Sequence, residues 1–209
     1  DEAEDEMLDL YIQRADISNG QDILDLGCGW GSFSLYAAEK FPDSKITSLS
    51  NSNDQINFIK SQAKIKNLKN IDAVKMDVNH LRLDKKFDRI VSIEMFEHLR
   101  NYKSILNSLS SLLLDNGKLF VHIFCNKEAA YFYEVNSDFD WMTKYFFLGG
   151  IMPSKDIFSY FNENLTVINQ WDVNGIHYSK TSKGWLKNLY ANRNEILNIF
   201  SNHYEDPII

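Results

Sequence analysis

The sequence predicts an α/β fold, a doubly wound and mostly parallel sheet, and three observations support this prediction. Short apolar runs of strand length alternate with segments of helical period, a pattern typical of parallel β-α units. The first of these runs, Asp22–Leu26, ends in the closely spaced glycines of Gly27–Gly31 and leads into a helical segment. With 209 residues, 44% of them hydrophobic, the chain is long enough for one domain with a substantial core.

The elements follow from the apolar pattern in chain order. Five strands are expected at Asp22–Leu26, Lys45–Ser50, Ile71–Met76, Phe87–Ile93 and Lys118–Phe124. Helices are expected at Met7–Ala15, Ser32–Lys40, Asn53–Lys66 and Tyr102–Leu114. The turn Asp115–Gly117 should start the fifth strand, because Asn-Gly supplies the positive φ that such a reversal needs.

The pattern changes after Lys127. Residues 130–147 are dense in aromatic side chains, and Gly149–Ser154 should interrupt regular structure before a helix at Lys155–Phe161. A sixth strand is expected at Leu165–Val173, and a long helix at Ser182–Tyr204.

Composition narrows the range of partners. The formal net charge of −7 disfavours nucleic-acid binding, which relies on clustered Lys and Arg, and favours a small-molecule or apolar partner. No apolar run approaches the ~20 residues needed to span a bilayer, and the acidic start of the chain is unlike a signal peptide. The two cysteines lack metal-ligand spacing. We therefore expect a cytoplasmic protein with reduced thiols, no metal site and no stable membrane insertion; its oligomeric state cannot be read from the sequence.

The glycine turn predicts a ligand site at the end of the first strand. Gly27 and Gly29 would let backbone amides approach an anionic or zwitterionic ligand beside a helix N-terminus. The spacing is not the G-x-G-x-x-G of dinucleotide sites. Asp25 could orient the loop or attract the ammonium group of a methionine moiety, and the alternative is a turn that only tightens packing.

The other strand ends should complete this pocket, because ligands of doubly wound sheets lie across the carboxyl ends of the strands. Neutral polar groups there can bind ribose hydroxyls, and Asp77 can accept a hydrogen bond from an adenine amino group. The alternatives are an ordinary helix cap with a surface glutamine, and a loop acid. The candidate residues are Ser50, Asn51, Gln55, Asp77, Val78 and Ile93.

Two carboxylates and an imidazole follow the fourth strand: Glu94, Glu97 and His98. Methyl transfer to an amine needs a neutral nitrogen, so an enzyme must accept a proton and align that nitrogen. Glu97 and His98 suit this task. The alternative is a solvated acidic helix start with His98 on the surface.

Aromatic side chains could enclose the apolar body of a cationic substrate. Core packing is the alternative for each of them, and His122 in the fifth strand is either a core histidine or a site residue. The candidate substrate-binding residues from this pattern are Phe96, His122, Trp141, Tyr145 and Phe147.

Several of these segments together resemble the coclaurine N-methyltransferase-like proteins of the cyclopropane-fatty-acid synthase group, within the class I methyltransferases. The resemblance lies in Asp25–Ala38, Ser92–His98, Phe120–Cys125, Trp141–Ser154 and Val173–Trp185. It implies a Rossmann-like fold, S-adenosylmethionine as cofactor with S-adenosylhomocysteine as product, and N-methylation of a small-molecule amine. It also implies catalytic roles for Glu94, Glu97 and His98, and cofactor contacts from Asn51, Gln55, Asp77 and Val78.

The same resemblance leaves two alternatives open. In cyclopropane synthases, the positions that match Glu97, His122 and Tyr178 hold a bicarbonate, so methylene transfer to an unsaturated phospholipid is one alternative. A non-catalytic module that binds the cofactor is the other. An N-terminal lid and the family's last strand have no counterpart here, so we expect a chain truncated at both ends and a six-stranded sheet.

These inferences give a domain division. The chain is expected to be a single domain, 1–209. Residues 1–125 would form the cofactor-binding core, 126–164 an aromatic-rich insertion on the substrate side, and 165–209 a C-terminal strand and helix.

Overall fold

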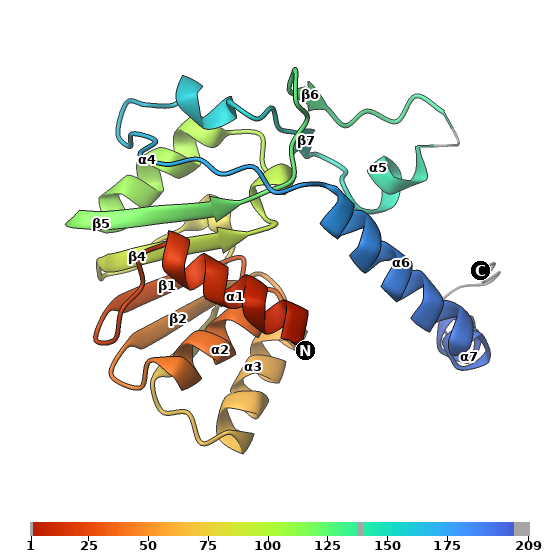
Figure 1. Cartoon of the computed structure of the whole chain (residues 1–209), viewed down its shortest axis with the longest axis horizontal. Coiled ribbons are helices and arrows are strands. Elements are labelled where there is room, and N and C mark those ends of the chain that lie inside the picture. Colours follow the sequence, from red (N-terminus) through yellow and green to blue (C-terminus); the bar gives the residue numbers. More distant parts are fainter. Residues whose placement is uncertain (1, 138–139, 203–209) are drawn as a thin grey trace. The chain divides into compact units, whose positions relative to one another are not determined.

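A computed structural model describes residues 2–137 and 140–202 of the chain. The chain separates into two compact units, Asp1–Val167 and Ile168–Ile209. The first unit holds the sheet and is shown with the rest of the chain in Figure 1.

Five parallel strands form the sheet of the first unit in the order β3-β2-β1-β4-β5. The strands are β1 (Asp22–Leu26), β2 (Lys45–Ser50), β3 (Ile71–Lys75), β4 (Phe87–Ile93) and β5 (Leu113–His122). The strand order reverses between β1 and β4, which is the switch point where doubly wound sheets bind ligands. The predicted fold class is confirmed, because the sheet is parallel and carries helices on both faces.

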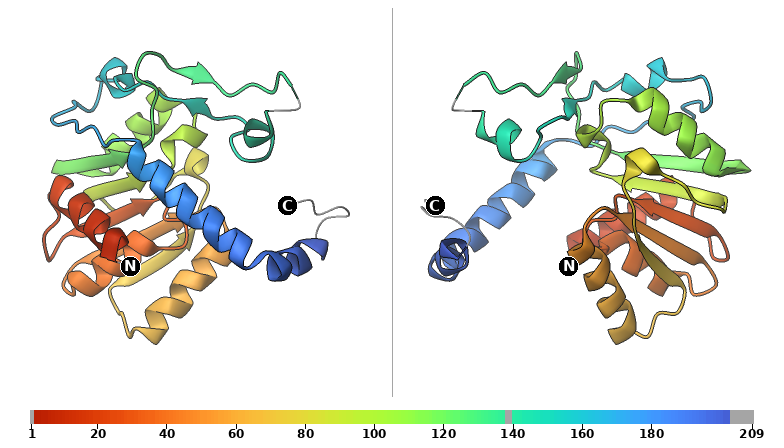
Figure 2. Two further views of the ribbon diagram at one scale, coloured as in Figure 1. Left: turned by 45° about the vertical axis from the view of Figure 1, so that its right-hand side comes forward. Right: turned by 180° about the vertical axis from the view of Figure 1, so that it is seen from behind.

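Helices cover the two faces of the sheet unequally. The helices of this core are α1 (Glu2–Arg14), α2 (Ser32–Lys40), α3 (Asn53–Ile65) and α4 (Tyr102–Leu112). α1 and α2 pack on the face that carries Ile23, while α4 packs on the face that carries Leu24. α1 lies in front of the sheet in Figure 1, and α4 lies in front in the rear view of Figure 2. Both faces are therefore buried, as expected for parallel strands.

The end of α1 is fastened to the sheet by a buried arginine of β4. Arg89 Nε donates to the carbonyl oxygens of Ala15 and Asp16 at 2.9 and 2.8 Å, and Nη2 lies 3.0 Å from Asp16 Oδ2. The guanidinium group thus satisfies carbonyls that α1 leaves without helical partners.

The start of β5 differs from the prediction. Leu113 pairs with Phe87 and Lys118 with Arg89, so the strand already begins at Leu113. Residues 114–117 of β5 lie opposite the single residue Asp88 of β4, which makes the pairing irregular there. Neither Asn116 nor Gly117 is among the described residues with positive φ. The predicted turn is wrong, because burial of Leu113 against the core ends α4 and starts the strand directly.

The insertion contains a small antiparallel pair, one strand of which lies within the stretch Gly149–Ser154, where an interruption of regular structure was expected. β6 (Tyr131–Phe132) pairs with β7 (Ile151–Met152), and α5 (Trp141–Tyr145) lies between them in sequence. The helix predicted at Lys155–Phe161 is only a short 3-10 helix, η3 (Ile157–Tyr160). Two further 3-10 helices, η1 (Val78–His80) and η2 (Phe96–His98), follow β3 and β4.

The predicted sixth strand at Leu165–Val173 is wrong. These residues have no regular structure and are mostly exposed, and an alternating pattern without a neighbouring strand has nothing to pair with. The sheet therefore has five strands and not six.

The described part of the second unit contains two helices, α6 (Ile176–Ala191) and α7 (Arg193–Ser201), which Asn192 separates. The single helix predicted at Ser182–Tyr204 thus starts earlier and is interrupted; residues 203 and 204 lie outside the described residues. No helix in the described ranges combines the length and apolar character needed to cross a bilayer.

Candidate active site

The glycine turn after β1 has three positive φ angles, 77° at Gly27, 54° at Gly29 and 86° at Gly31. A Cβ atom at Gly27 would lie 2.5 Å from Cγ of Met95, and one at Gly31 would lie 2.6 Å from Cγ1 of Ile59. At Gly29 no atom lies within 4 Å of that position. Packing therefore explains Gly27 and Gly31, whereas Gly29 borders open space where a ligand could approach the backbone.

Asp25 lies behind this turn and is buried, with 2% of its surface exposed. Its Oδ2 accepts a hydrogen bond of 2.6 Å from the Ser34 hydroxyl, and that hydroxyl accepts one of 2.7 Å from Ser48. Burial raises the pKa of Asp25 to about 7, although the hydrogen bonds from Ser34 oppose this shift. Of the two roles expected for Asp25, this geometry favours orienting the loop.

The end of β2 brings two of the predicted residues together. Ser50 Oγ donates to Gln55 Oε1 at 2.6 Å. The cap of α3 is Ser52, whose hydroxyl accepts from the Gln55 backbone amide at 3.4 Å, and Asn51 is exposed beside it. A polar edge therefore stands beside the glycine turn, which hydrogen bonds through Gly27 N and Cys28 N to the carbonyl oxygen of Leu49.

Asp77 caps the 3-10 helix η1 after β3. Its Oδ1 accepts from the backbone amide and the side-chain amide of Asn79, both at 2.9 Å. The backbone hydrogen bond from Asn79 is the main reason that the pKa of this carboxyl is lowered. Asp77 is exposed and ionised, and Val78 next to it is half-buried.

Glu94 and Glu97 form a carboxyl pair just beyond β4. Glu94 has a φ of 51°, which is uncommon for a residue with a side chain, and its amide donates to the carbonyl oxygen of His122 at 2.8 Å. Its Oε1 lies 3.4 Å from His122 Nε2. Backbone and side chain thus both attach Glu94 to His122 of β5.

Glu97 is enclosed, with 1% of its surface exposed, and its Oε2 has no hydrogen-bond partner among the described residues. Burial, followed by the neighbouring Glu94, raises the pKa of Glu97 to about 8. Burial also raises the pKa of Glu94. A buried carboxyl oxygen without a partner is costly, so this site is suited to a polar or cationic ligand.

Two histidines are near this pair: His122 Nε2 lies 3.4 Å from Glu94 Oε1, and His98 follows Glu97 in sequence and is exposed. Burial lowers the pKa of both His98 and His122, which favours their neutral forms. The Tyr11 ring of α1 packs edge-on against His122 at 5.1 Å between ring centroids. Among the described residues, no three His, Cys, Asp or Glu side chains are grouped as metal ligands.

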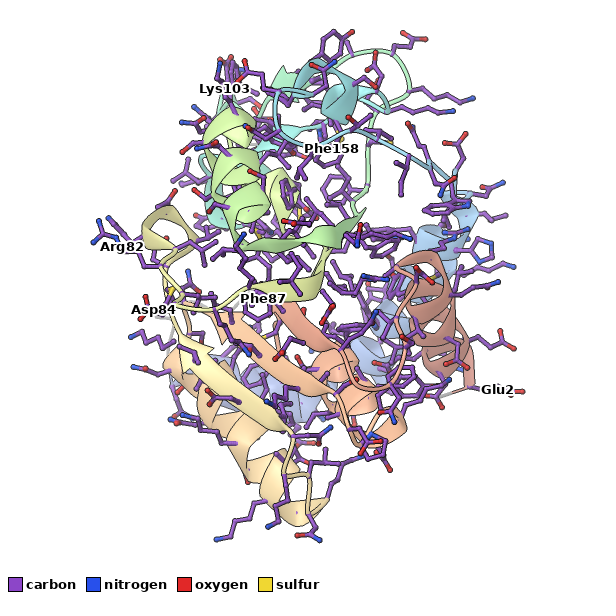
Figure 3. All side chains as sticks on the ribbon, turned by 90° about the vertical axis from the view of Figure 1, so that its left-hand side faces the viewer. Glu2, Arg82, Asp84, Phe87, Lys103 and Phe158 are labelled. Carbon is purple, nitrogen blue, oxygen red and sulfur yellow. The ribbon has the colours of Figure 1, made fainter. Side chains whose placement is uncertain are left out.

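The predicted aromatic residues occupy different environments. Phe96 is fully buried and packs against Tyr102 and against Phe158, which is labelled in Figure 3. Phe147 is buried against His98, whereas Trp141 and Tyr145 on α5 are exposed. Of the remaining candidates, Ile93 is half-buried and packs against the α1–α2 cluster, and Tyr178 is exposed on α6 of the second unit.

The structure brings Glu94 and His122 together and places Glu97 and His98 in the 3-10 helix η2 that follows, and all four were candidates from the sequence. Three residues that contact the site residues, Ser34, Ser48 and Tyr11, were not predicted from the sequence. The sequence held a signal for the two serines, because each places a hydroxyl group among apolar residues: Ser34 on the buried side of the helix α2, and Ser48 inside the strand β2.

Comparison with known proteins identifies the family. The sequence model of the family described as mycolic acid cyclopropane synthetase matches residues 1–206. The chain belongs to this family. Within it, the (S)-coclaurine N-methyltransferase of Thalictrum flavum subsp. glaucum is 41% identical over 194 residues, covering 92% of this chain and 54% of the relative.

Two further relatives match nearly the whole chain at different levels of identity. The pavine N-methyltransferase of the same plant is 41% identical over 206 residues, covering 98% of this chain and 58% of the relative. The cyclopropane-fatty-acyl-phospholipid synthase of Escherichia coli K12 is 26% identical over 205 residues, covering 97% of this chain and 51% of the relative. The chain spans about half the length of the curated relatives it matches.

A solved structure agrees with this assignment. A coclaurine N-methyltransferase bound to N-methylheliamine and SAH superimposes with a TM-score of 0.92 at 39% identity, covering 98% of this chain and 61% of that chain. The methyltransferase-type Rossmann-like fold expected from the sequence is thereby confirmed.

Proposed function

We propose that this chain contains the cofactor-binding and catalytic core of an S-adenosylmethionine-dependent N-methyltransferase for a small-molecule amine. The observation that carries the proposal is the carboxyl pair of half-buried Glu94 and buried Glu97 beside the glycine turn. Met95 lies between the two glutamates in sequence and packs against Gly27, so the carboxyl pair and the turn share one edge of the sheet. The 41% identity to amine N-methyltransferases supports the same function.

The residues at the strand ends fit the cofactor. Gly29 leaves open space against the backbone at the N-terminus of α2, which suits the charged methionine part. Ser50 and Gln55 offer neutral polar groups for ribose hydroxyls, and Asp77 offers an acceptor for an amino group. When bound, S-adenosylmethionine supplies an electrophilic methyl group on a sulfonium.

The side chains of the site can prepare an amine for methylation. Most aliphatic amines are protonated at neutral pH, and the nitrogen must lose that proton before it can attack. A cation next to Glu94 and Glu97 favours the ionised form of these carboxyls, which compensates for their burial. His98, whose side chain is exposed and whose pKa is lowered by partial desolvation, accepts the proton from the nitrogen. His122 holds Glu94 in place.

A labelled-methyl assay tests the proposal. The chain is incubated with labelled S-adenosylmethionine and a panel of secondary and tertiary amines, and we expect transfer to at least one amine. Calorimetry with S-adenosylhomocysteine is done in parallel. Binding without transfer to any amine would contradict catalysis and support the non-catalytic module.

The lipid reaction is the second candidate, because Glu97 and His122 lie at the same edge of the sheet, where Glu94 Oε1 is 3.4 Å from His122 Nε2. Its discriminating measurement is the mass of unsaturated phospholipids after incubation with chain and cofactor. A gain of one methylene unit in the acyl chain would favour cyclopropanation over amine methylation.

A cytoplasmic location stays a prediction, and fractionation of cells tests it.

A further inference from the structure

Three rings of the first unit form a continuous stack that ends on His98. The Tyr133 and Phe147 rings are stacked with centroids 4.8 Å apart and planes 24° apart. Phe147 and His98 are stacked at 5.4 Å and 16°. The imidazole is therefore the last ring of a stack that the insertion supplies.

Two more rings close the sides of Phe147. Phe124 meets it edge-on at 5.6 Å and 83°, and Phe146 does so at 4.8 Å and 84°. Phe146 also contacts His98 edge-on at 5.5 Å. With rings on several sides and 7% of its surface exposed, Phe147 has little freedom to move.

The backbone of the insertion is packed just as closely on the turn that carries His98. Gly150 N donates to the carbonyl oxygen of Phe147 at 2.9 Å. A Cβ atom at Gly150 would lie 2.3 Å from the carbonyl oxygen of Glu97 and 3.3 Å from Cα of His98. Glycine at this position thus lets the Phe147–Gly150 turn lie directly on η2.

We infer that Phe147, supported by Tyr133, is a positioning residue that fixes the orientation of the His98 ring. An isolated imidazole rotates broadly about its second side-chain torsion, and a parallel neighbouring ring limits this rotation. Small misplacements of a catalytic group cost large factors in rate. The inference rests on the proposed function, in which His98 accepts a proton. It gives Phe147 a role other than the substrate contact expected from the sequence.

Nuclear magnetic resonance of the histidine ring protons tests the stack without any turnover. The His98 signals are assigned by their loss in His98→Gln, and in the parent chain the face of Phe147 should shift them upfield. We expect this shift to disappear in Phe147→Leu, to shrink in Tyr133→Leu and to persist in Tyr133→Phe. Phe132→Leu, which removes an exposed ring next to Tyr133, should leave the His98 signals unchanged.

Kinetics separate positioning from substrate contact. Phe147→Leu should lower kcat by about tenfold to a hundredfold with little change in the KM for the amine. A raised KM with unchanged kcat would instead make Phe147 a substrate contact and overturn the inference. His98 signals that keep their parent positions in a folded Phe147→Leu chain would also overturn the inference. If Phe147→Leu does not fold, Tyr133→Leu decides by the same two measurements.

The outcomes distinguish this inference from the proposed function. A parent chain that shows the upfield shift, loses it in Phe147→Leu and methylates no amine contradicts the proposed function while the stack stands. A chain that methylates amines and shows no such shift contradicts the inference alone.

Discussion

The hydroxyl of Ser34 in α2 donates a 2.6 Å hydrogen bond to Oδ2 of Asp25, the residue two positions before the glycine turn. The contact joins the first turn of α2 to β1 from behind the loop, and Ser48 extends it to β2. All three side chains are buried, so the loop is braced from the core.

Ser34→Ala should destabilise the protein and weaken cofactor binding together. The substitution leaves the Asp25 carboxyl with fewer donors inside the core, which should lower the free energy of unfolding by about 1–3 kcal/mol. Urea unfolding and calorimetry with S-adenosylhomocysteine measure the two effects. Ser108→Ala, at an exposed serine of α4, is the matched control and should stay within about 0.5 kcal/mol. Equal free energies of unfolding for the two variants would contradict the support of the loop by Ser34.

Asp25→Asn should change how stability depends on pH. The pKa of Asp25 is raised from 3.8 to about 7 in the folded protein, so between these values the folded state binds more protons than the unfolded state. The free energy of unfolding therefore falls as pH rises through this window. The variant lacks this contribution, and the difference between the two chains should change by up to about 1.4 kcal/mol per pH unit.

Denaturant unfolding of both chains at several pH values between about 5 and 8 measures that difference. Glu97 shifts in the same direction, but it is present in both chains and cancels in the comparison. A difference that does not vary with pH would show that Asp25 is already ionised when buried.

Gly29→Ala should weaken cofactor binding more than it weakens the fold. Gly29 and Gly20 both have positive φ, and a Cβ atom added at either glycine would have no neighbouring atom within 4 Å. Alanine at either position should therefore cost about 1–2 kcal/mol through backbone strain. Only Gly29→Ala places a methyl group in the proposed cofactor site, so only this variant should lose affinity for S-adenosylhomocysteine in calorimetry. If the two variants bind S-adenosylhomocysteine with equal affinity, Gly29 does not belong to the cofactor site.

Glu97→Gln should abolish most of the activity without destabilising the protein. The amide keeps the shape but cannot carry the negative charge, so methyl transfer should fall by about a hundredfold to ten-thousandfold. A neutral amide is also easier to bury than a carboxylate, so the unfolding midpoint should be unchanged or higher. Glu163→Gln, in an exposed ion pair with Lys103, is the control for both measurements. A Glu97→Gln chain with full activity would exclude Glu97 from the chemistry.

The elements that sequence reasoning predicted well are those that bury a periodic apolar face. All five strands of the sheet and the four helices of its core are found, and their ends lie close to the predicted ones except that α1 and β5 begin earlier, at Glu2 and Leu113. Leu165–Val173 has an alternating pattern of the same kind, but it has no regular structure and is mostly exposed, so its apolar side chains form no buried face. The start of β5 was also misjudged, since pairing of Leu113 with Phe87 overrides the local preference of Asn-Gly for a turn.

The candidate site shows the same division. Glu94, Glu97 and His98 were predictable because they directly follow a strand whose carboxyl end faces the ligand edge of the sheet. The stack of Tyr133 and Phe147 on His98 was not predictable, because it joins residues far apart in sequence that meet only after the insertion folds onto η2.

The amino-acid sequence by itself determined the α/β class, the strand ends that carry the site and the kinds of chemical group present there, because these depend on local periodicity and residue type. Only the tertiary structure decided that Asp25 supports the loop from the core, that Glu97 is buried with one oxygen lacking a hydrogen-bond partner among the described residues, and that Phe147 stacks on His98. Those properties depend on burial and on contacts between distant segments, and no single stretch of sequence contains them.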